Sequence, residues 1–202
     1  MESSARYLPA EERRAVTIRT VIELAGSHNP SEISTSAIAR RMHLTQGALF
    51  RHFASKEALW QATMEWVRDQ LLARIDQAAH TGSSPLEGLE AMFMSHIEFI
   101  IEHPGVPRIL FGELQRAEPT PAKQVAQTIV ARSTRLVCAR IEAGKAPGAL
   151  AAEVGTGSAA LLFLGAVQGV VIRSLLSGDL QRLRSQAPGV FTLFRRALRS
   201  AS

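Results

Sequence analysis

The sequence predicts an all-α protein, and three observations support this fold class. Apolar residues recur every three to four positions through most of the 202 residues, which is the period of an α-helix. Alternating β-branched runs and Asn-Gly hairpin turns are missing. Clusters of Gly, Pro, Ser and Asn divide the pattern into about nine segments. We therefore expect a small helical domain over 1–56 and a larger helical domain over 57–202, joined by a long helix.

The N-terminal domain is predicted to hold three helices. The first begins near Pro9 and ends in the breakers at 26–30. The second covers 35–42 and the third 45–52, so a tight turn of two residues joins them. Two short helices with so short a connection are typical of a helix-turn-helix motif.

The larger domain begins with a helix that runs from residue 55 to a stop at Gly82. This helix has about 25 residues and spans roughly 37 Å at 1.5 Å per residue. Five further helices are expected between Gly and Pro breakers, over 85–102, 106–114, 122–143, 149–177 (with room for a later start) and 189–199.

Composition restricts the classes of function. The net charge of +5 and the pI near 10.3 favour a polyanionic partner, but the first 56 residues carry eight Lys or Arg against five Glu, so the positions of the charges must decide. The single Cys138 excludes an internal disulfide framework and a multi-cysteine metal site, and favours the cytoplasm. The N-terminus lacks the apolar core of a signal peptide.

The most apolar stretch, 159–176, has nearly the length of a membrane span. Gly165, Gln168, Gly169 and Arg173 interrupt it. This pattern argues against a membrane and favours a buried helix or an interface helix.

The helix-turn-helix motif carries the functional interpretation. The major groove of DNA is about 12 Å wide and admits one α-helix. Gly47 and Ala48 are small residues on the outer face of the third helix, so the backbone there can approach bases and phosphates closely.

Residues 35–59, TSAIARRMHLTQGALFRHFASKEAL, resemble the signature of the TetR/AcrR family of transcriptional regulators. The resemblance implies that the second helix contacts phosphate, that the third reads base edges, and that the residues after it bind the backbone. The candidate DNA-binding residues are Thr35 (phosphate), Thr45, Gln46, Ala48 and Arg51 (groove), His52 and Lys56 (backbone), together with Gly47 and Phe50.

Two positions depart from the family pattern. The family usually has Tyr, whose hydroxyl binds a phosphate, where this chain has Phe50, so that contact is expected to be missing. The family usually has Gly where this chain has His43. Either His43 adopts a strained backbone conformation or the turn differs slightly.

The resemblance also implies a homodimer that binds a palindromic double-stranded DNA operator, most often a repressor that a small apolar effector releases. The apolar helix after residue 156 and the last helix are the expected dimer surface, although a buried core helix is the alternative for the former. The candidate interface residues are Leu161, Leu164, Gly165, Gln168, Gly169, Ile172, Val190, Phe194 and Leu198, and Leu193 and Ala197 lie beside them.

An effector pocket is expected between the long helix and the helices from 86 to 143. Ordinary core is the alternative interpretation, because apolar residues at helical spacing also line packed interiors. The candidate pocket residues are Phe93, Met94, His96, Phe99, Phe111, Gln115, Ile129 and Arg132.

Enzyme signatures are missing from the sequence. We find no Gly-rich phosphate loop, no His-Glu-x-x-His pair and no Gly-x-Ser-x-Gly motif, and the six histidines form no convincing metal set. We therefore expect no catalytic residues, no metal and no cofactor. A helical interaction protein or a small enzyme without operator binding remains the alternative.

Overall fold

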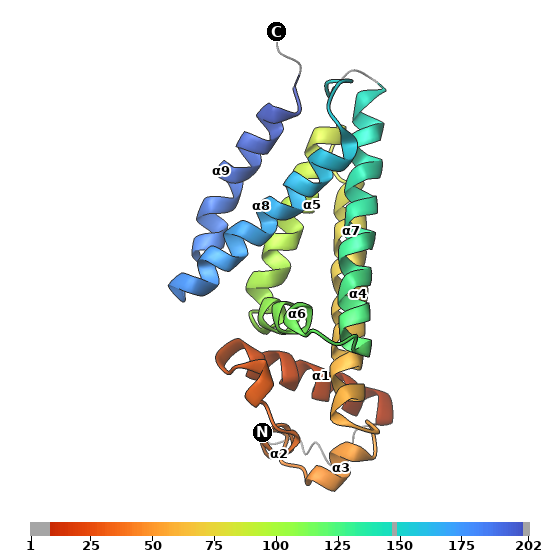
Figure 1. Cartoon of the computed structure of the whole chain (residues 1–202), viewed down its shortest axis with the longest axis vertical. Helices are drawn as coiled ribbons and strands as arrows, with labels where there is room; N and C mark the ends of the chain where they lie inside the picture. The colour runs from red at the N-terminus through yellow and green to blue at the C-terminus, as the bar shows by residue number, and fades with distance from the viewer. Residues whose placement is uncertain (1–8, 147–148, 200–202) are drawn as a thin grey trace. The chain divides into compact units, whose positions relative to one another are not determined.

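The computed structural model describes residues 9–146 and 149–199, and every regular element in these ranges is helical, which confirms the all-α prediction (Figure 1). The described ranges contain nine α-helices and one short 3₁₀ helix: α1 Ala10–Ser27, η2 Pro30–Glu32, α2 Thr35–Arg41, α3 Gln46–Phe50, α4 Lys56–Ala79, α5 Pro85–Glu102, α6 Gly105–Gln115, α7 Pro121–Lys145, α8 Thr156–Ser177 and α9 Arg182–Ala197.

The helices form two compact units. Unit 1 comprises the described residues up to Arg68 and residues His103–Thr128, and unit 2 comprises Asp69–Glu102 and the described residues from Ile129 onward. Helices α4 and α7 therefore each contribute one part to both units. The predicted boundary between a DNA-binding domain and a larger domain at residue 56 is a functional division, and it stays a prediction.

In unit 1, α1 packs against α6 and α2. The contact with α6 is close at Gly105, where an added Cβ would lie 1.9 Å from the carbonyl oxygen of Ile22. No other residue fits this position without moving one of the two helices. The apolar side of α1 buries Val21, Ile22 and Ala25.

Unit 2 has an aromatic core contributed by α5, α8 and α9. The ring of Phe93 meets that of Phe163 edge to face, with 5.3 Å between centroids, and it lies 5.6 Å from the ring of Phe191. Phe194 packs on Phe163 and on Phe191. All four side chains are buried, so these three helices share one core.

Two elements differ from the sequence prediction. Helix α9 begins at Arg182, well before the predicted start at residue 189, and continues through Pro188. Leu183 and Ala187 are buried in this early part of the helix, and Arg184 donates to Glu98 of α5 at 2.7 Å. Burial and this ion pair hold the turns that precede Pro188, although proline cannot donate a backbone hydrogen bond.

The second difference is the 3₁₀ helix η2, which lies where the sequence predicts a loop. The side chain of Asn29 accepts a hydrogen bond from the backbone N–H of Ser31 at 3.3 Å and caps this turn. Helix α8 takes the later of the two starts that the sequence allowed, at Thr156.

Candidate nucleic-acid interface

Side-chain caps define the starts of α2 and α3. The hydroxyl of Ser34 accepts a hydrogen bond from the backbone N–H of Ala37 at 3.1 Å, and the hydroxyl of Thr45 accepts from that of Ala48 at 3.2 Å. Ser and Thr are favoured at this position because they satisfy backbone donors that a helix leaves free at its first turn. Both helices therefore begin where the sequence dictates.

The turn between α2 and α3 contains a residue in the left-handed conformation. His43 has φ of 54°, so the first of the two alternatives for this residue is the one found. The backbone N–H of Leu44 then bonds to the carbonyl of Ala39 at 2.8 Å, which closes the turn. A glycine would adopt this conformation with less strain.

Gln46 joins the two helices of the motif. Its Nε2 donates to the hydroxyl of Thr35 at 2.8 Å, and its Oε1 accepts from the hydroxyl of Ser36 at 3.1 Å. Thr35 is buried, with 9% of its surface exposed. Both ends of the Gln46 amide are thus engaged within the protein, which favours a positioning role for this side chain over a direct contact with a base.

Arg14 of α1 holds the chain that follows α3. Its guanidinium lies over the ring of Phe53, 4.5 Å from the centroid, and it donates to the backbone carbonyl of His52. Arg14 and Ser36 were not among the predicted site residues. These contacts join residues far apart in sequence or depend on the mutual position of two helices, so no local pattern signals them.

The outer side of the motif exposes most of the predicted DNA-binding residues. Thr45, Gln46, Gly47, Phe50 and Arg51 are exposed, Ala48, His52 and Lys56 are half-buried, and Thr35 is the one that is buried. Nothing lies within 4 Å of a Cβ built on Gly47, so the backbone of α3 is open to an approaching molecule at that point.

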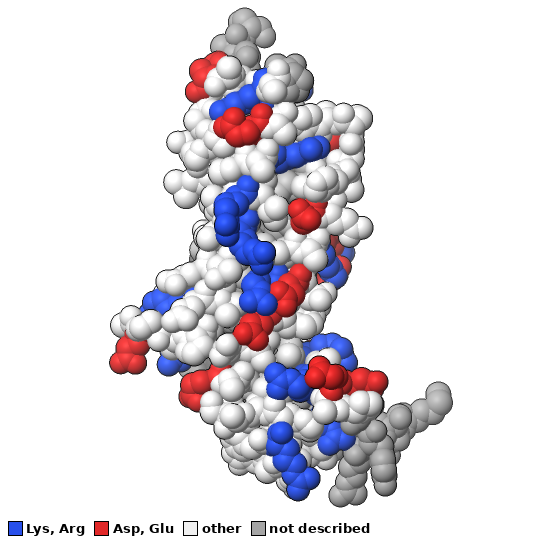
Figure 2. Space-filling view, turned by 90° about the vertical axis from the view of Figure 1, so that its right-hand side faces the viewer, with Lys and Arg blue, Asp and Glu red and all other residues white. Residues whose placement is uncertain are grey.

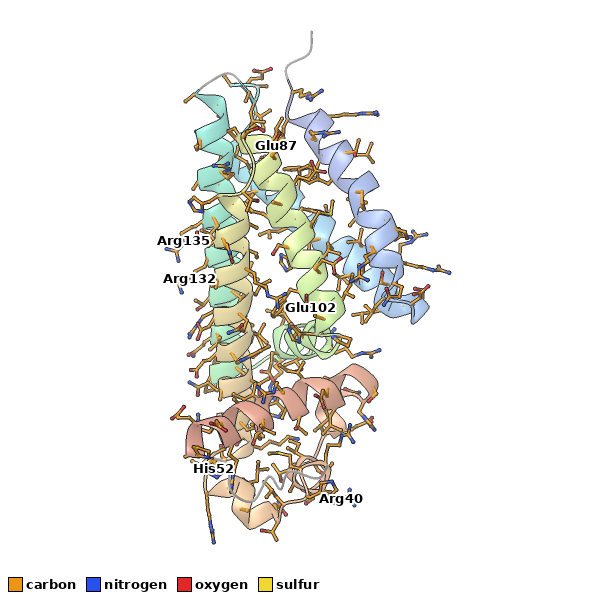
Figure 3. The ribbon with its side chains drawn as sticks, turned by 180° about the vertical axis from the view of Figure 1, so that it is seen from behind. Arg40, His52, Glu87, Glu102, Arg132 and Arg135 are labelled. Atoms are coloured by element: carbon orange, nitrogen blue, oxygen red, sulfur yellow. The ribbon has the colours of Figure 1, made fainter. Side chains whose placement is uncertain are left out.

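Two further arginines lie beside this surface. Arg40 and Arg41 at the end of α2 are exposed, and Figure 3 labels Arg40 together with His52. On the face drawn in Figure 2, Lys and Arg side chains are mixed with Asp and Glu. The local arrangement of charges on α2 and α3, more than the net charge of the chain, therefore suits a phosphate backbone.

The pKa of His52 lies below its ordinary value. Partial burial is the largest cause, and the charges of Arg13, Arg14 and Arg51 lower it further. The imidazole is therefore neutral at pH 7 and can gain a proton when an anion approaches.

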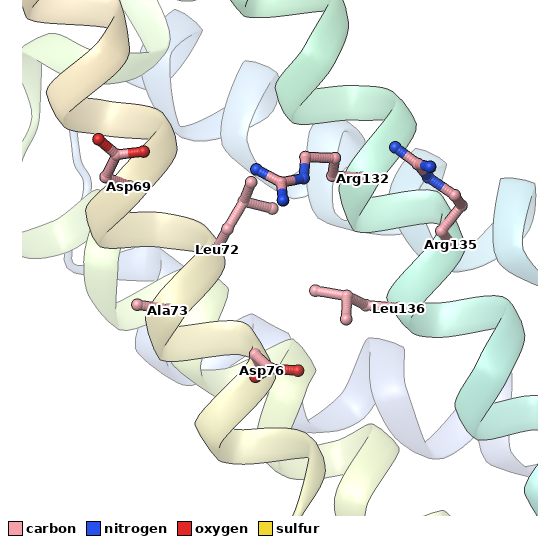
Figure 4. A pocket seen from close by; sticks show the side chains of 7 residues that line it. All are labelled: Asp69, Leu72, Ala73, Asp76, Arg132, Arg135 and Leu136. Atoms are coloured by element: carbon pink, nitrogen blue, oxygen red, sulfur yellow. The ribbon is translucent and has the colours of Figure 1, made fainter.

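Unit 2 contains an open groove of about 610 Å³ between α4 and α7 (Figure 4). Arg132 extends from α7 toward α4, and within the described part of the chain neither it nor Arg135 is ion-paired. The groove therefore offers charged edges around an apolar centre. It is lined by Asp69, Leu72, Ala73 and Asp76 of α4 and by Arg132, Arg135 and Leu136 of α7.

The structure distributes the predicted pocket residues over different environments. Arg132 lines the α4–α7 groove, whereas Phe93, Phe99 and Ile129 are buried in the core of unit 2. Met94 is half-buried in α5, and Phe111 and Gln115 lie on α6 in unit 1. The Nδ1 atom of His96 is buried and has no hydrogen-bond partner among the described residues. Burial lowers the pKa of His96 to about 4.

The predicted dimer surface is divided between the core and the exterior. Leu161 and Ile172 of α8 are exposed at 73% and 44%, and Gly165, Gln168 and Gly169 share their face. Val190 is half-buried. Leu164, Phe194 and Leu198 are buried in the chain's own core, so the candidate surface is corrected to exclude them and to include Leu162, Leu176 and Leu193, which are exposed.

Among the described residues, α8 is the one helix that is long and apolar enough to cross a membrane, and 44% of its apolar window is buried. Its buried face includes Ala160, Phe163 and Val167. A core helix with one uncovered apolar face accounts for this composition.

Comparison with known proteins gives matches in sequence and in structure. The family described as "Bacterial regulatory proteins, tetR family" matches residues 17–63, which cover most of α1 and all of α2 and α3. A curated relative, the nucleoid occlusion factor SlmA of Haemophilus ducreyi, is 28% identical over 114 residues, or 56% of either chain. The chain thus spans about half the length of the curated relatives it matches.

Solved structures share the fold over nearly the whole chain. FadR of Bacillus subtilis, a transcriptional regulator in complex with stearoyl-CoA, is 15% identical with a TM-score of 0.77 over 89% of this chain and 97% of its own. The ketosteroid transcriptional regulator KstR2 of Mycobacterium tuberculosis is 17% identical with a TM-score of 0.76 over 99% and 100%. Residues 17–63 thus match the TetR family of bacterial regulatory proteins, and the chain as a whole shares the fold of these solved structures.

Proposed function

We propose that this protein is a cytoplasmic transcriptional regulator that binds a palindromic DNA operator as a homodimer and releases it when a small effector binds. The observation that carries the proposal is the helix-turn-helix of α2 and α3, whose outer side exposes the open backbone at Gly47 beside Arg40, Arg41 and Arg51. The exposure and the positive charge of this surface support binding in the major groove.

Selection of bound sites from random duplexes tests DNA binding. We expect two inverted half-sites with centres separated by about one helical turn, roughly 34–36 Å, because a two-fold symmetric dimer presents two copies of α3. Arg51→Gln is expected to weaken binding to the selected site, with Arg108→Gln, an exposed change on α6, as the matched control. If no sequence is enriched over the input pool, operator binding is wrong.

Dimer formation is supported by the uncovered apolar face of α8. Leu161, Ile172 and Leu176 recur on one side of this helix, where nothing lies within 4 Å of a Cβ built on Gly165 or Gly169. A second copy of the chain could approach α8 closely at these glycines. Several exposed apolar side chains on one helix face are typical of a protein–protein interface.

Effector binding is supported by the α4–α7 groove and by two of the solved structures that share the fold. One neighbour is in complex with stearoyl-CoA, which joins a long acyl chain to an anionic CoA group, and another is a ketosteroid regulator, so both are linked to molecules with an apolar part. We propose a small effector that is mainly apolar, with any anionic group placed at Arg132 and Arg135. Because these two arginines have no ion-pair partner in the described part of the chain, a ligand would not have to displace one.

The effector proposal is tested by measuring operator affinity with stearoyl-CoA and with a ketosteroid as first probes. An effector should weaken operator binding at least tenfold. If one of the probes does so, the double variant Arg132→Ala and Arg135→Ala shows whether the groove takes part, with Arg108→Ala as the control for loss of positive charge. An effector that acts equally on the double variant and on the control would place the site elsewhere.

A further inference from the structure

Phe50 is an aromatic side chain on the outer side of the short helix α3. Its surface is 40% exposed, whereas its neighbours Leu49 and Phe53 are exposed by only 1% and 3%. The other large apolar side chains of comparable exposure in the described part of the chain lie on α8 and α9 in unit 2. Among the described residues of unit 1, Phe50 is thus the one exposed large apolar side chain, and packing within the chain does not account for its exposure.

The residues around Phe50 leave few polar groups for reading bases. Gln46 has its amide engaged by Thr35 and Ser36. Gly47 has no side chain, and Thr45 caps the helix through its hydroxyl. The exposed part of α3 therefore presents a bare backbone and an apolar ring, followed by the cation of Arg51.

The major groove of DNA offers one apolar feature on the edges of its bases, the C5-methyl group of thymine. Arg51, the next residue, attracts the polyanionic DNA, and the exposed ring gains binding free energy when it covers that methyl group. We propose that Phe50 contacts a thymine methyl group and so determines one position in each half-site of the operator. This inference rests on the proposed function.

The test uses the operator found by selection and replaces each thymine in turn by uracil, which lacks only the methyl group. Burial of one methyl group changes an equilibrium constant by about fourfold, so the wild-type protein should lose about three- to tenfold in affinity at one thymine of each half-site. Phe50→Ala should bind the thymine and uracil duplexes equally. Phe50→Tyr, which keeps the ring, should retain the preference for thymine.

Arg51→Gln is the matched control, since it should weaken binding to both duplexes without changing their ratio. The ratio of two affinities for one protein sample also corrects for a variant that is partly unfolded. The inference is overturned if every uracil substitution is tolerated by the wild type, or if Phe50→Ala keeps the penalty. If selection enriches no duplex at all, the operator proposal fails and this inference fails with it, whereas tolerated uracil in a bound operator overturns this inference alone.

Discussion

Helices α3 and α8 both leave one face uncovered, but the chemistry of the two faces is opposite. The face of α3 has polar and cationic side chains around a single ring, Phe50. The face of α8 has exposed leucine and isoleucine side chains at 161, 172 and 176, interrupted mainly by small residues. The first surface suits a polyanion that must be released, and the second suits a partner that stays bound.

The largest effect is expected from a change on α8. Leu161→Glu with Leu176→Glu puts two charges on the proposed dimer seam, where burial would cost their solvation. We expect a monomer in sedimentation velocity and a loss of operator affinity of about 100-fold or more, since a monomer has one copy of α3 and binds one half-site. Ala139→Glu, an exposed change on α7, should leave both measurements unchanged. A double variant that stays dimeric would remove α8 from the interface.

The next effect concerns the interior of unit 2. Burial lowers the pKa of His96 to about 4, below the value near 6.5 expected in the unfolded chain. Protonation therefore favours the unfolded state, so the stabilisation is complete above pH 6.5 and declines toward pH 4, by about 3 kcal/mol. Urea unfolding at several pH values should show this decline in the wild type and a smaller one in His96→Leu. Exchange of the exposed His80 for Gln is the control.

A smaller effect is expected from the hydrogen bonds by which Gln46 joins α3 to α2. Gln46→Ala leaves the buried hydroxyl of Thr35 without its partner, so the free energy of unfolding should fall by about 1 kcal/mol. Operator affinity should weaken for all sequences alike, because a positioning residue carries no base preference. Ser36→Ala removes the other, more exposed bond and should cost less. A changed base preference in Gln46→Ala would instead assign this side chain to base readout.

The smallest effect is a dependence of DNA binding on pH. The pKa of His52 is lowered in the free protein by burial and by nearby arginines, and a phosphate close to the ring would raise it. Binding then takes up a proton, so affinity should increase as pH falls from 8 to 6, by roughly three- to fivefold. His52→Gln should flatten the profile at constant salt. An equal slope in that variant would show that another group titrates.

Helices α2 and α3 were predictable because their signals are local. Ser34 and Thr45 cap helices at the predicted starts, and Ile38, Leu49 and Phe53 are buried as their spacing requires. The bridge from Gln46 to Thr35 was not predictable in the same way. It depends on the angle between two helices, and the periodicity of one helix does not contain that angle.

In unit 2 the sequence predicted apolar faces but not their partners. Phe194 and Leu164 lie on helices expected at the dimer surface, yet both face the chain's own core. Spacing shows that a residue is apolar and on which side of its helix it lies, but the position of the neighbouring helices decides whether that side is covered. The early start of α9 was missed for a related reason, since the ion pair of Arg184 with Glu98 joins distant segments.

The close contact at Gly105 has a consequence for how the protein unfolds locally. Helix α6 follows α5 after only two residues, yet Gly105 ties it to α1, in the unit that also contains α2 and α3. Helices that share a core exchange their amide protons with solvent together, because the core must open for any of them. In native-state hydrogen exchange, the amides of α6 should therefore show the same opening free energy as those of α2 and α3, although α6 is next to α5 in the sequence.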